Sequence, residues 1–313
     1  MLYIYNSMKD ILWLNYNLKI TSLNEYPRYS SFEWQKDTYY FTKLRINEND
    51  FQELLIIVNE LLTKNYPVYP FIKNINGSFI TKVKNDNFVL LKVTESKKEI
   101  SFLDMIKLAR IPLINKKVSS LNRDNWSELW SKKEDYLEYQ ISELGKNYPI
   151  ILEVFSYYAG LVENAISYAN HVIKEKGESN IYLAHRRVIS PNYYLNAYNP
   201  LNFIFDLKVR DIAEYLKSEA LEDPKYALID LKSYLSLEPL THYEASMLYA
   251  RLLYPSYYLD LHEKIMNKEI DEKAILKIVD KINDMELFLN NAYILISKYI
   301  PIEKVMWLEK KEL

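Results

Sequence analysis

The sequence predicts an α+β protein in two parts, a small β-rich N-terminal lobe and a larger, mostly helical C-terminal lobe. Up to about residue 95, short runs of aromatic and β-branched residues alternate with polar turns, which is typical of strands. From Ser101 onward, apolar residues recur at the three- and four-residue spacing of amphipathic helices. We therefore place the N-terminal lobe at 1–95 and the C-terminal lobe at 96–313.

The N-terminal lobe is expected to form an antiparallel sheet with one helix. That helix begins at 47–50, where Asn and Asp can cap it, and its apolar residues continue to Leu62 before Pro67 ends the pattern. The connector 36–37, the Asn-Gly pair at 76–77 and the polar run 84–86 read as turns. The strands are expected at 31–35, 38–46, 68–72, 78–83 and 87–93.

The C-terminal lobe is expected to be helical apart from an irregular stretch over 182–202, which has two prolines and could hold short strands. Trp126 and Trp130 stand four residues apart and belong to one helix face, so we expect both in the core. The helical patterns cover 126–141, 150–169, 209–221, 224–237, 242–254, 272–284 and 285–299.

Composition excludes several classes of site. Of the 313 residues none is cysteine, which removes disulfides, thiolate nucleophiles and Cys-ligated zinc. Only four are glycine and no two lie close together, so phosphate-cradling glycine motifs are absent. A formal net charge of -2 argues against nucleic-acid binding. The longest apolar run, 148–162, is interrupted by Glu153 and is too short for a membrane span. We expect a soluble, intracellular protein.

Several strings resemble the YutH branch of the spore-coat kinase-like proteins. The longest is FSYYAGLVENAISY at 155–168, and the others follow in the same order along the chain. This branch is similar to the CotS-type coat proteins and to the aminoglycoside phosphotransferase and choline kinase superfamily. The resemblance implies a protein-kinase-like bilobal fold, cytoplasmic synthesis followed by location in the spore coat, and other coat proteins as partners. The remaining strings are LAHRRV at 183–188, FDLKVRDIAEY at 205–215, LYARLLYPSYY at 248–258, Ile300-Pro301 and Trp307-Leu308.

Phosphotransferases of this superfamily carry a catalytic loop of the H-G-D-x-H-x-x-N type, which the resemblance places within 182–211. His185 matches the leading His, Arg186 follows it, and Arg187 stands where the catalytic Asp is expected. An arginine stays protonated and cannot orient or deprotonate an acceptor hydroxyl. The loop is therefore degenerate, and we assign no catalytic residue. Asp206 and Glu163 are weak candidates for a displaced carboxylate. Asp206 is also the nearest candidate for the metal-binding Asp that the resemblance implies, but it lies only five positions before Asp211, closer than that Asp is expected, so no metal site is assigned.

The remaining parts of a nucleotide site are also incomplete. The phosphate-covering loop would lie at 35–37, between the first two expected strands, and it contains no glycine. Lys43 is the candidate nucleotide-binding lysine, with Glu53 or Glu60 as its helix partner; its alternative is an exposed strand lysine.

Three polar residues are better explained as structural. Asp211 stands at a helix start, where it can cap free N–H groups. Asn164, with Glu163, is expected in a buried polar network, or alternatively as a pair lining a pocket. Arg251 lies among apolar residues and is expected to pair with Asp211 or Glu163. The pair Arg186 and Arg187 could bind an anion or form ion pairs.

Three functional hypotheses remain. The first is a catalytically inactive kinase-like protein that acts through protein contacts in coat assembly, without a cofactor. The second is an ATP- and magnesium-dependent small-molecule phosphotransferase with a displaced carboxylate. The third is a module that binds a nucleotide or another anion through Lys43, Arg186 or Arg187.

Overall fold

The computed structural model describes residues 7–94, 101–112, 120–174, 180–188 and 195–308, and it divides the chain into two compact units. Of the described residues, the first unit contains 7–94, 120–121 and 195–203, and the second contains the others. The expected boundary near residue 95 falls outside the described residues. The first unit also takes in two later segments, since Tyr69 N donates to Tyr198 O at 2.9 Å and Ser120 Oγ donates to Asp50.

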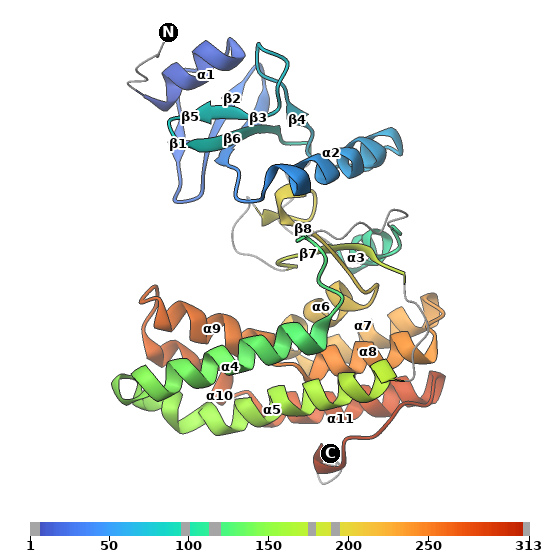
Figure 1. The fold of residues 1–313 in the computed structure, drawn as a ribbon. Coiled ribbons are helices and arrows are strands. Elements are labelled where there is room, and N and C mark those ends of the chain that lie inside the picture. The colour runs from blue at the N-terminus through green and yellow to red at the C-terminus, as the bar shows by residue number, and fades with distance from the viewer. Residues whose placement is uncertain (1–6, 95–100, 113–119, 175–179, 189–194, 309–313) are drawn as a thin grey trace. The chain divides into compact units, whose positions relative to one another are not determined.

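The first unit is a six-stranded antiparallel sheet with two helices (Figure 1). Along the sheet the order is β1-β2-β3-β6-β4, and β5 pairs with β6. Buried residues of α1 pack with buried residues of β2, β3 and β6 in one apolar cluster. In α2, the Asn47 side chain accepts a hydrogen bond from Asp50 N and caps the helix, as its sequence predicts. The elements are α1 (Met8–Tyr16), β1 (Asn24–Glu25), β2 (Tyr29–Trp34), β3 (Asp37–Lys43), α2 (Glu48–Thr63), β4 (Phe71–Ile72), β5 (Thr81–Val83) and β6 (Asp86–Lys92).

Two elements at the start of the chain were not predicted. Ser7 caps α1, and the helix ends at Asn17, which adopts a left-handed conformation. The two-residue strand β1 pairs with β2 through Asn24 and Ser31, and it is too short to give a period-2 pattern. The first hairpin of the sheet is therefore 26–28, between β1 and β2, and not 35–37 as expected.

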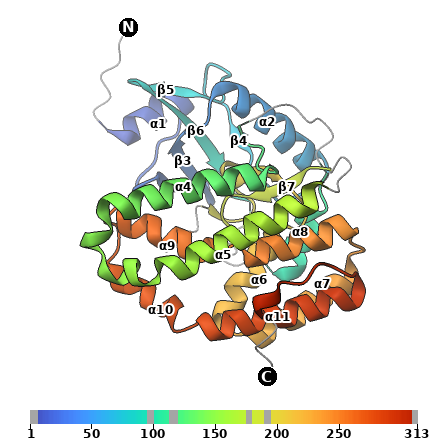
Figure 2. The same ribbon diagram turned by 60° about the horizontal axis from the view of Figure 1, so that its bottom comes forward.

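The second unit is a helical assembly that also carries a two-stranded sheet of β7 and β8 (Figure 2). Helix α5 packs against α4 and α8, while α6 packs against α7, α8 and α11. The elements are α3 (Phe102–Ala109), α4 (Trp126–Leu144), α5 (Pro149–Lys174), β7 (Tyr182–His185), β8 (Phe203–Asp206), α6 (Arg210–Glu222), α7 (Pro224–Leu237), α8 (His242–Leu253), α9 (Ser256–Met266), α10 (Leu276–Val279) and α11 (Ile282–Tyr299), with short 3₁₀ turns at Gly145–Asn147, Glu272–Ile275 and Met306–Leu308. The 3₁₀ turn Pro200–Asn202 and the first residue of β8 belong to the first unit.

The α+β class is confirmed, and the helices expected at 209–221, 224–237 and 242–254 lie within one residue of their predicted ends, whereas α4, α5 and α11 are longer than expected. The helix expected over 272–284 is wrong: that segment forms a 3₁₀ turn, then the short α10, and α11 begins at Ile282. Helix α9 was not predicted, because Pro255 stands at its N-cap and reads as a stop signal. Among the described helices, none is long and apolar enough to cross a membrane.

Candidate functional site

The loop that resembles a catalytic loop begins at His185, the last residue of β7, and α6 fixes this residue in place. Asp211 accepts a hydrogen bond from His185 N at 3.1 Å, and its other oxygen lies 2.6 Å from His185 Nδ1. Arg210 Nη1 donates to the carbonyl oxygen of His185 and lies 3.0 Å from Asp211 Oδ1. Burial opposes ionisation of Asp211, but the charges of His185 and Arg210 outweigh it and lower its pKa. Asp211 lies in the first turn of α6, as expected. Its side chain does not cap that helix but contacts His185 and Arg210, so it anchors the loop.

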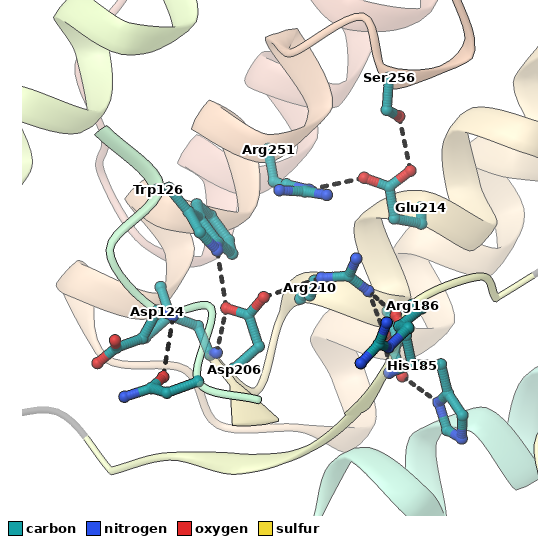
Figure 3. Close-up of polar contacts among 12 residues, drawn as sticks. Asp124, Trp126, His185, Arg186, Asp206, Arg210, Glu214, Arg251 and Ser256 are labelled. Atoms are coloured by element: carbon teal, nitrogen blue, oxygen red, sulfur yellow. Dashed lines mark hydrogen bonds and ion pairs between the residues drawn. The ribbon is translucent and has the colours of Figure 1, made fainter. Parts of the chain in front are cut away.

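Asp206, at the end of β8, is buried and held by three donors (Figure 3). Its Oδ1 accepts hydrogen bonds from Trp126 Nε1 and Leu207 N, each at 2.7 Å. Its Oδ2 lies 2.9 Å from Arg210 Nε. Burial raises the pKa of Asp206 to about 7, although Arg210 and Arg251 act in the opposite direction. Trp126, Leu207 and Arg210 therefore direct this carboxylate to contacts inside the helical unit.

Glu214, one turn along α6 from Arg210, is the centre of a second buried network. Arg251 Nε lies 2.6 Å from Glu214 Oε1, and Ser256 Oγ donates to Oε2 at 2.6 Å. Lys217 Nζ lies 3.0 Å from Oε1 and also donates to Tyr254 O and Ser256 Oγ. Burial opposes ionisation of Glu214, but Lys217 and Arg251 outweigh it and hold its pKa well below the ordinary value. Burial lowers the pKa of Lys217 to about 8.

The partner of Arg251 differs from the expectation. The sequence predicted Asp211 or Glu163, whereas the structure pairs Arg251 with Glu214. The guanidinium carbon also lies 5.1 Å from the ring centre of Trp126 and 5.5 Å from that of Trp130. Both tryptophans are buried and stacked, as expected for core residues. The rings provide a cation–π surface beside the ion pair.

The tip of the loop differs from its base, because Arg186 and Arg187 are exposed. Arg187 Nη2 lies 2.9 Å from Asp260 Oδ1 on α9, and Arg187 Nη1 donates to Arg186 O. Burial raises the pKa of Asp260, and the charge of Arg187 opposes this shift. At the tip, a guanidinium therefore stands where the superfamily resemblance places a catalytic carboxylate.

Lys43 lies near the end of β3 and pairs with Asp86 at 2.6 Å, with both side chains about half exposed. Within the described residues neither Glu53 nor Glu60 pairs with it, and Glu60 instead contacts Lys64. In the segment 35–37, Gln35 and Lys36 form a two-residue turn between β2 and β3, and both have positive φ. Asp37, which follows them, pairs with Lys92 at 2.7 Å.

Glu163 and Asn164 do not form the expected buried network. Both are exposed on α5, and Asn164 Nδ2 donates to the carbonyl oxygen of Gly160, one turn earlier in the same helix. The neighbouring Tyr157 instead donates to Glu286 Oε1 at 3.0 Å. Neither residue lies in the networks around His185 and Glu214, so the pocket-lining alternative has no support.

The sequence analysis missed the roles of Arg210, Glu214 and Lys217. These three charged residues stand at i, i+4 and i+7 and therefore share one face of α6. The spacing was visible in the sequence, but a charged stripe on a helix normally faces water. Here it faces the interior, and Figure 3 shows Arg210 between the chain of contacts from Trp126 to His185 and the chain from Arg251 to Ser256.

Chemically, the described part of this arrangement holds a loop in place, and the acid at its tip, Asp260, is paired with Arg187. Asp206, Asp211 and Glu214 are committed to buried hydrogen bonds and ion pairs. Within the described residues no group of three or more His, Cys, Asp or Glu side chains is placed to hold a metal ion.

A small antiparallel sheet with a helix, and a helical unit in which a histidine-led loop follows a short strand, together define a kinase-like phosphotransferase fold. Comparison with solved structures confirms this class. An aminoglycoside phosphotransferase from Alicyclobacillus acidocaldarius superposes with a TM-score of 0.67 at 11% identity, covering 90% of this chain and 94% of its own. A spectinomycin phosphotransferase, APH(9)-Ia, determined with ADP and spectinomycin, gives 0.57 at 9% identity, covering 92% and 97%.

Within this class, the model of the family described as "Spore coat putative kinase YutH" matches residues 9–292, and the chain belongs to that family. A relative is the endospore coat-associated protein YutH of Bacillus subtilis (strain 168). The two are 24% identical, over 97% of this chain and 98% of the relative. The resemblance seen in the sequence is thereby confirmed.

Proposed function

We propose that this chain is a catalytically inactive kinase-like protein of the endospore coat that acts through protein–protein contacts in coat assembly. It would be made in the cytoplasm and then join other coat proteins. The feature that carries the proposal is the loop tip, where Arg187 stands at the position at which the superfamily resemblance places the catalytic Asp. A permanently charged guanidinium cannot accept the proton of an acceptor hydroxyl.

Two further features support the proposal. Neither the hairpin 26–28 nor the turn 35–37 contains glycine, so neither backbone has the freedom of a phosphate-covering loop. Asp206, the nearest candidate for a magnesium ligand, is buried against Trp126 and Arg210. The coat context comes from the B. subtilis relative, which is an endospore coat-associated protein.

A second candidate function is a phosphotransferase with a displaced carboxylate, and Asp260 is the observation in its favour. Its carboxylate lies 2.9 Å from Arg187 Nη2, and its pKa is raised by burial as a general base requires. Asp206 and Glu163, the acids considered from the sequence, are respectively buried and on an exposed face of α5.

The test is phosphate release from ATP by the purified full-length chain, with and without magnesium. We expect no magnesium-dependent release above a heat-denatured sample, and the same result for Asp260→Asn. Magnesium-dependent turnover that Asp260→Asn abolishes would replace the inactive-kinase proposal with the second candidate. Coat association is tested with a fluorescent fusion expressed during sporulation, which should collect at the spore surface; a fusion that stays diffuse in the mother cell contradicts it.

A further inference from the structure

A pocket of about 180 Å³ lies on the helical unit beside the loop tip. Its described lining residues come from the loop, from α6, from α8 and from the first two turns of α9. Five of them are basic and two are acidic, so the lining carries an excess of three positive charges. The basic residues are Arg186, Arg187, Arg210, Lys217 and Arg251, and the acidic residues are Glu214 and Asp260.

The two inner guanidinium groups of this pocket, those of Arg210 and Arg251, have more donors than their acceptors use. Each guanidinium carries five N–H donors. The contacts of Arg210 use Nε and Nη1, and the hydrogen bond of Arg251 uses Nε alone. In Figure 3, one terminal nitrogen of Arg210 points to the side on which Glu214 and Arg251 lie and carries no dashed contact. Donor capacity for a further acceptor is therefore present.

The surrounding structure keeps these donors in place, and the start of α9 favours a negatively charged ligand. Arg210 is held by Asp206 and Asp211, and Arg251 is held by Glu214 and by the faces of two tryptophans. Ser256 and Tyr257, in the first turn of α9, also line the pocket, so the positive end of that helix dipole adds to the field. Guanidinium groups that are held in place commonly bind a phosphate group through bidentate hydrogen bonds.

The size of the pocket limits the ligand. Sites that enclose a nucleotide or another drug-sized molecule have volumes of roughly 300–1,000 Å³. A volume of about 180 Å³ suits a single tetrahedral anion and part of the group that carries it. Charge and size together favour a phosphate group over a whole nucleotide.

We propose that this pocket, bordered by Arg186 and Arg187 at its mouth and by Arg210 and Arg251 inside, binds the phosphate monoester group of a ligand. Asp260 then competes with the ligand, because its carboxylate already occupies Arg187. This inference does not depend on whether the chain transfers phosphate.

The test is isothermal titration calorimetry of the full-length chain with inorganic phosphate, against chloride of equal ionic strength. A second arm uses three versions of one short peptide, with phosphoserine, serine or glutamate at the central position. We expect saturable binding of the phosphorylated probes. A phosphopeptide that binds more tightly than inorganic phosphate identifies a phosphorylated protein as the source of the group, and the reverse order identifies a small free anion.

Three variants and a matched control make the test specific. Because a charge-assisted hydrogen bond is lost, Arg186→Gln and Arg187→Gln should each weaken binding roughly tenfold or more. Asp260→Asn should strengthen it severalfold, a gain that misfolding could not produce. Arg123→Gln, at an exposed arginine of the same unit outside the pocket lining, should leave binding unchanged.

The proposal fails if the folded chain binds neither phosphate nor the phosphopeptide. It also fails if binding is unchanged in both Arg186→Gln and Arg187→Gln, or if the glutamate peptide binds as tightly as the phosphopeptide. Circular dichroism of each variant verifies that the protein used in the titration is folded.

Discussion

The base and the tip of the loop after β7 are built in opposite ways. At the base, Asp211 and Arg210 hold His185 inside the helical unit, and all three residues are almost fully buried. At the tip, Arg186 and Arg187 are exposed, and a surface aspartate pairs with the second of them. The base positions a loop, whereas the residues that would perform phosphoryl transfer belong to the tip.

An active phosphotransferase must both hold this loop in position and present reacting residues at its tip. The difference between base and tip shows that the first requirement can be met without the second. A buried charge network is costly to disturb, because removal of one partner leaves another charge uncompensated. An exposed residue can change with little effect on folding. A chain selected only for its shape can therefore keep the base and replace the tip. The following variants test whether the energetic difference is as large as the structure implies.

The largest effect is expected for Glu214→Gln. This change leaves the buried Lys217 and Arg251 without their shared carboxylate, and we expect a loss of about 4 kcal/mol in the free energy of unfolding. Urea unfolding followed by circular dichroism measures it. Glu138→Gln, at an exposed position of α4, is the control and should change stability by less than about 0.5 kcal/mol.

The same variant gives a pH dependence of defined sign. The pKa of Glu214 is lower in the folded chain than in the unfolded chain, so its ionisation stabilises the fold above about pH 4.5. That contribution is lost as the pH falls from about 4.5 toward the folded-state pKa. The stability gap between the wild-type chain and Glu214→Gln should therefore be constant near neutrality and narrow in acid. A gap that stays constant down to pH 3 contradicts the ion-pair assignment.

A somewhat smaller loss, about 3 kcal/mol, is expected for Asp211→Asn. The amide keeps the size of the carboxylate but removes the charge facing His185 and Arg210, while Asp206 still pairs with Arg210. Thermal and urea unfolding measure the loss, and Asp135→Asn on the exposed face of α4 is the matched control. If the two variants are equally stable, the base of the loop is not an energetic anchor.

Trp126→Phe tests the hydrogen bond to Asp206. Phenylalanine keeps an aromatic ring in the core but cannot donate to the carboxylate. Trp130→Phe makes the same change in size at a buried ring that stacks on Trp126. At pH 8, above the pKa of about 7 of Asp206, we expect Trp126→Phe to cost about 1.5–3 kcal/mol more than Trp130→Phe, the value of a hydrogen bond to a charged group. Equal costs would assign the whole effect to packing.

The smallest effect is expected at the tip. Arg187→Gln removes one exposed ion pair with Asp260 and should change the free energy of unfolding by less than about 1 kcal/mol. The measurement is the same urea titration, repeated at low and high salt, because an exposed pair is screened. A loss comparable with that of Asp211→Asn would remove the contrast between base and tip.

The sequence was sufficient to predict the elements with strong periodicity. Helices α7 and α8 have clear start signals, Pro224 after Asp223 and the capping box of Thr241 and Glu244, and both were predicted to within a residue. The short β1 and the Pro-led α9 have no such signal. As a result, the first hairpin was assigned to the wrong turn.

The site was predictable only in part. Single positions such as Arg187 and Asp211 could be identified from the pattern of the loop. The ion-pair partners of these residues could not be identified, because they depend on which helices pack together. Glu214 and Arg251, for example, are separated by 37 positions in the sequence. Burial also could not be inferred for Glu163 and Asn164, which share α5 with many buried residues but point to solvent.

The aromatic stack beneath Arg251 gives the molecule an optical signature. The rings of Trp126 and Trp130 are stacked with their centres 5.3 Å apart, and Trp130 and Tyr254 are stacked at 4.2 Å. Chromophores fixed this closely couple their electronic transitions, so the folded helical unit should give a strong near-ultraviolet circular dichroism signal. Because all three rings lie beside Arg251 and Trp126 also donates to Asp206, that signal reports directly on the polar network at the base of the loop.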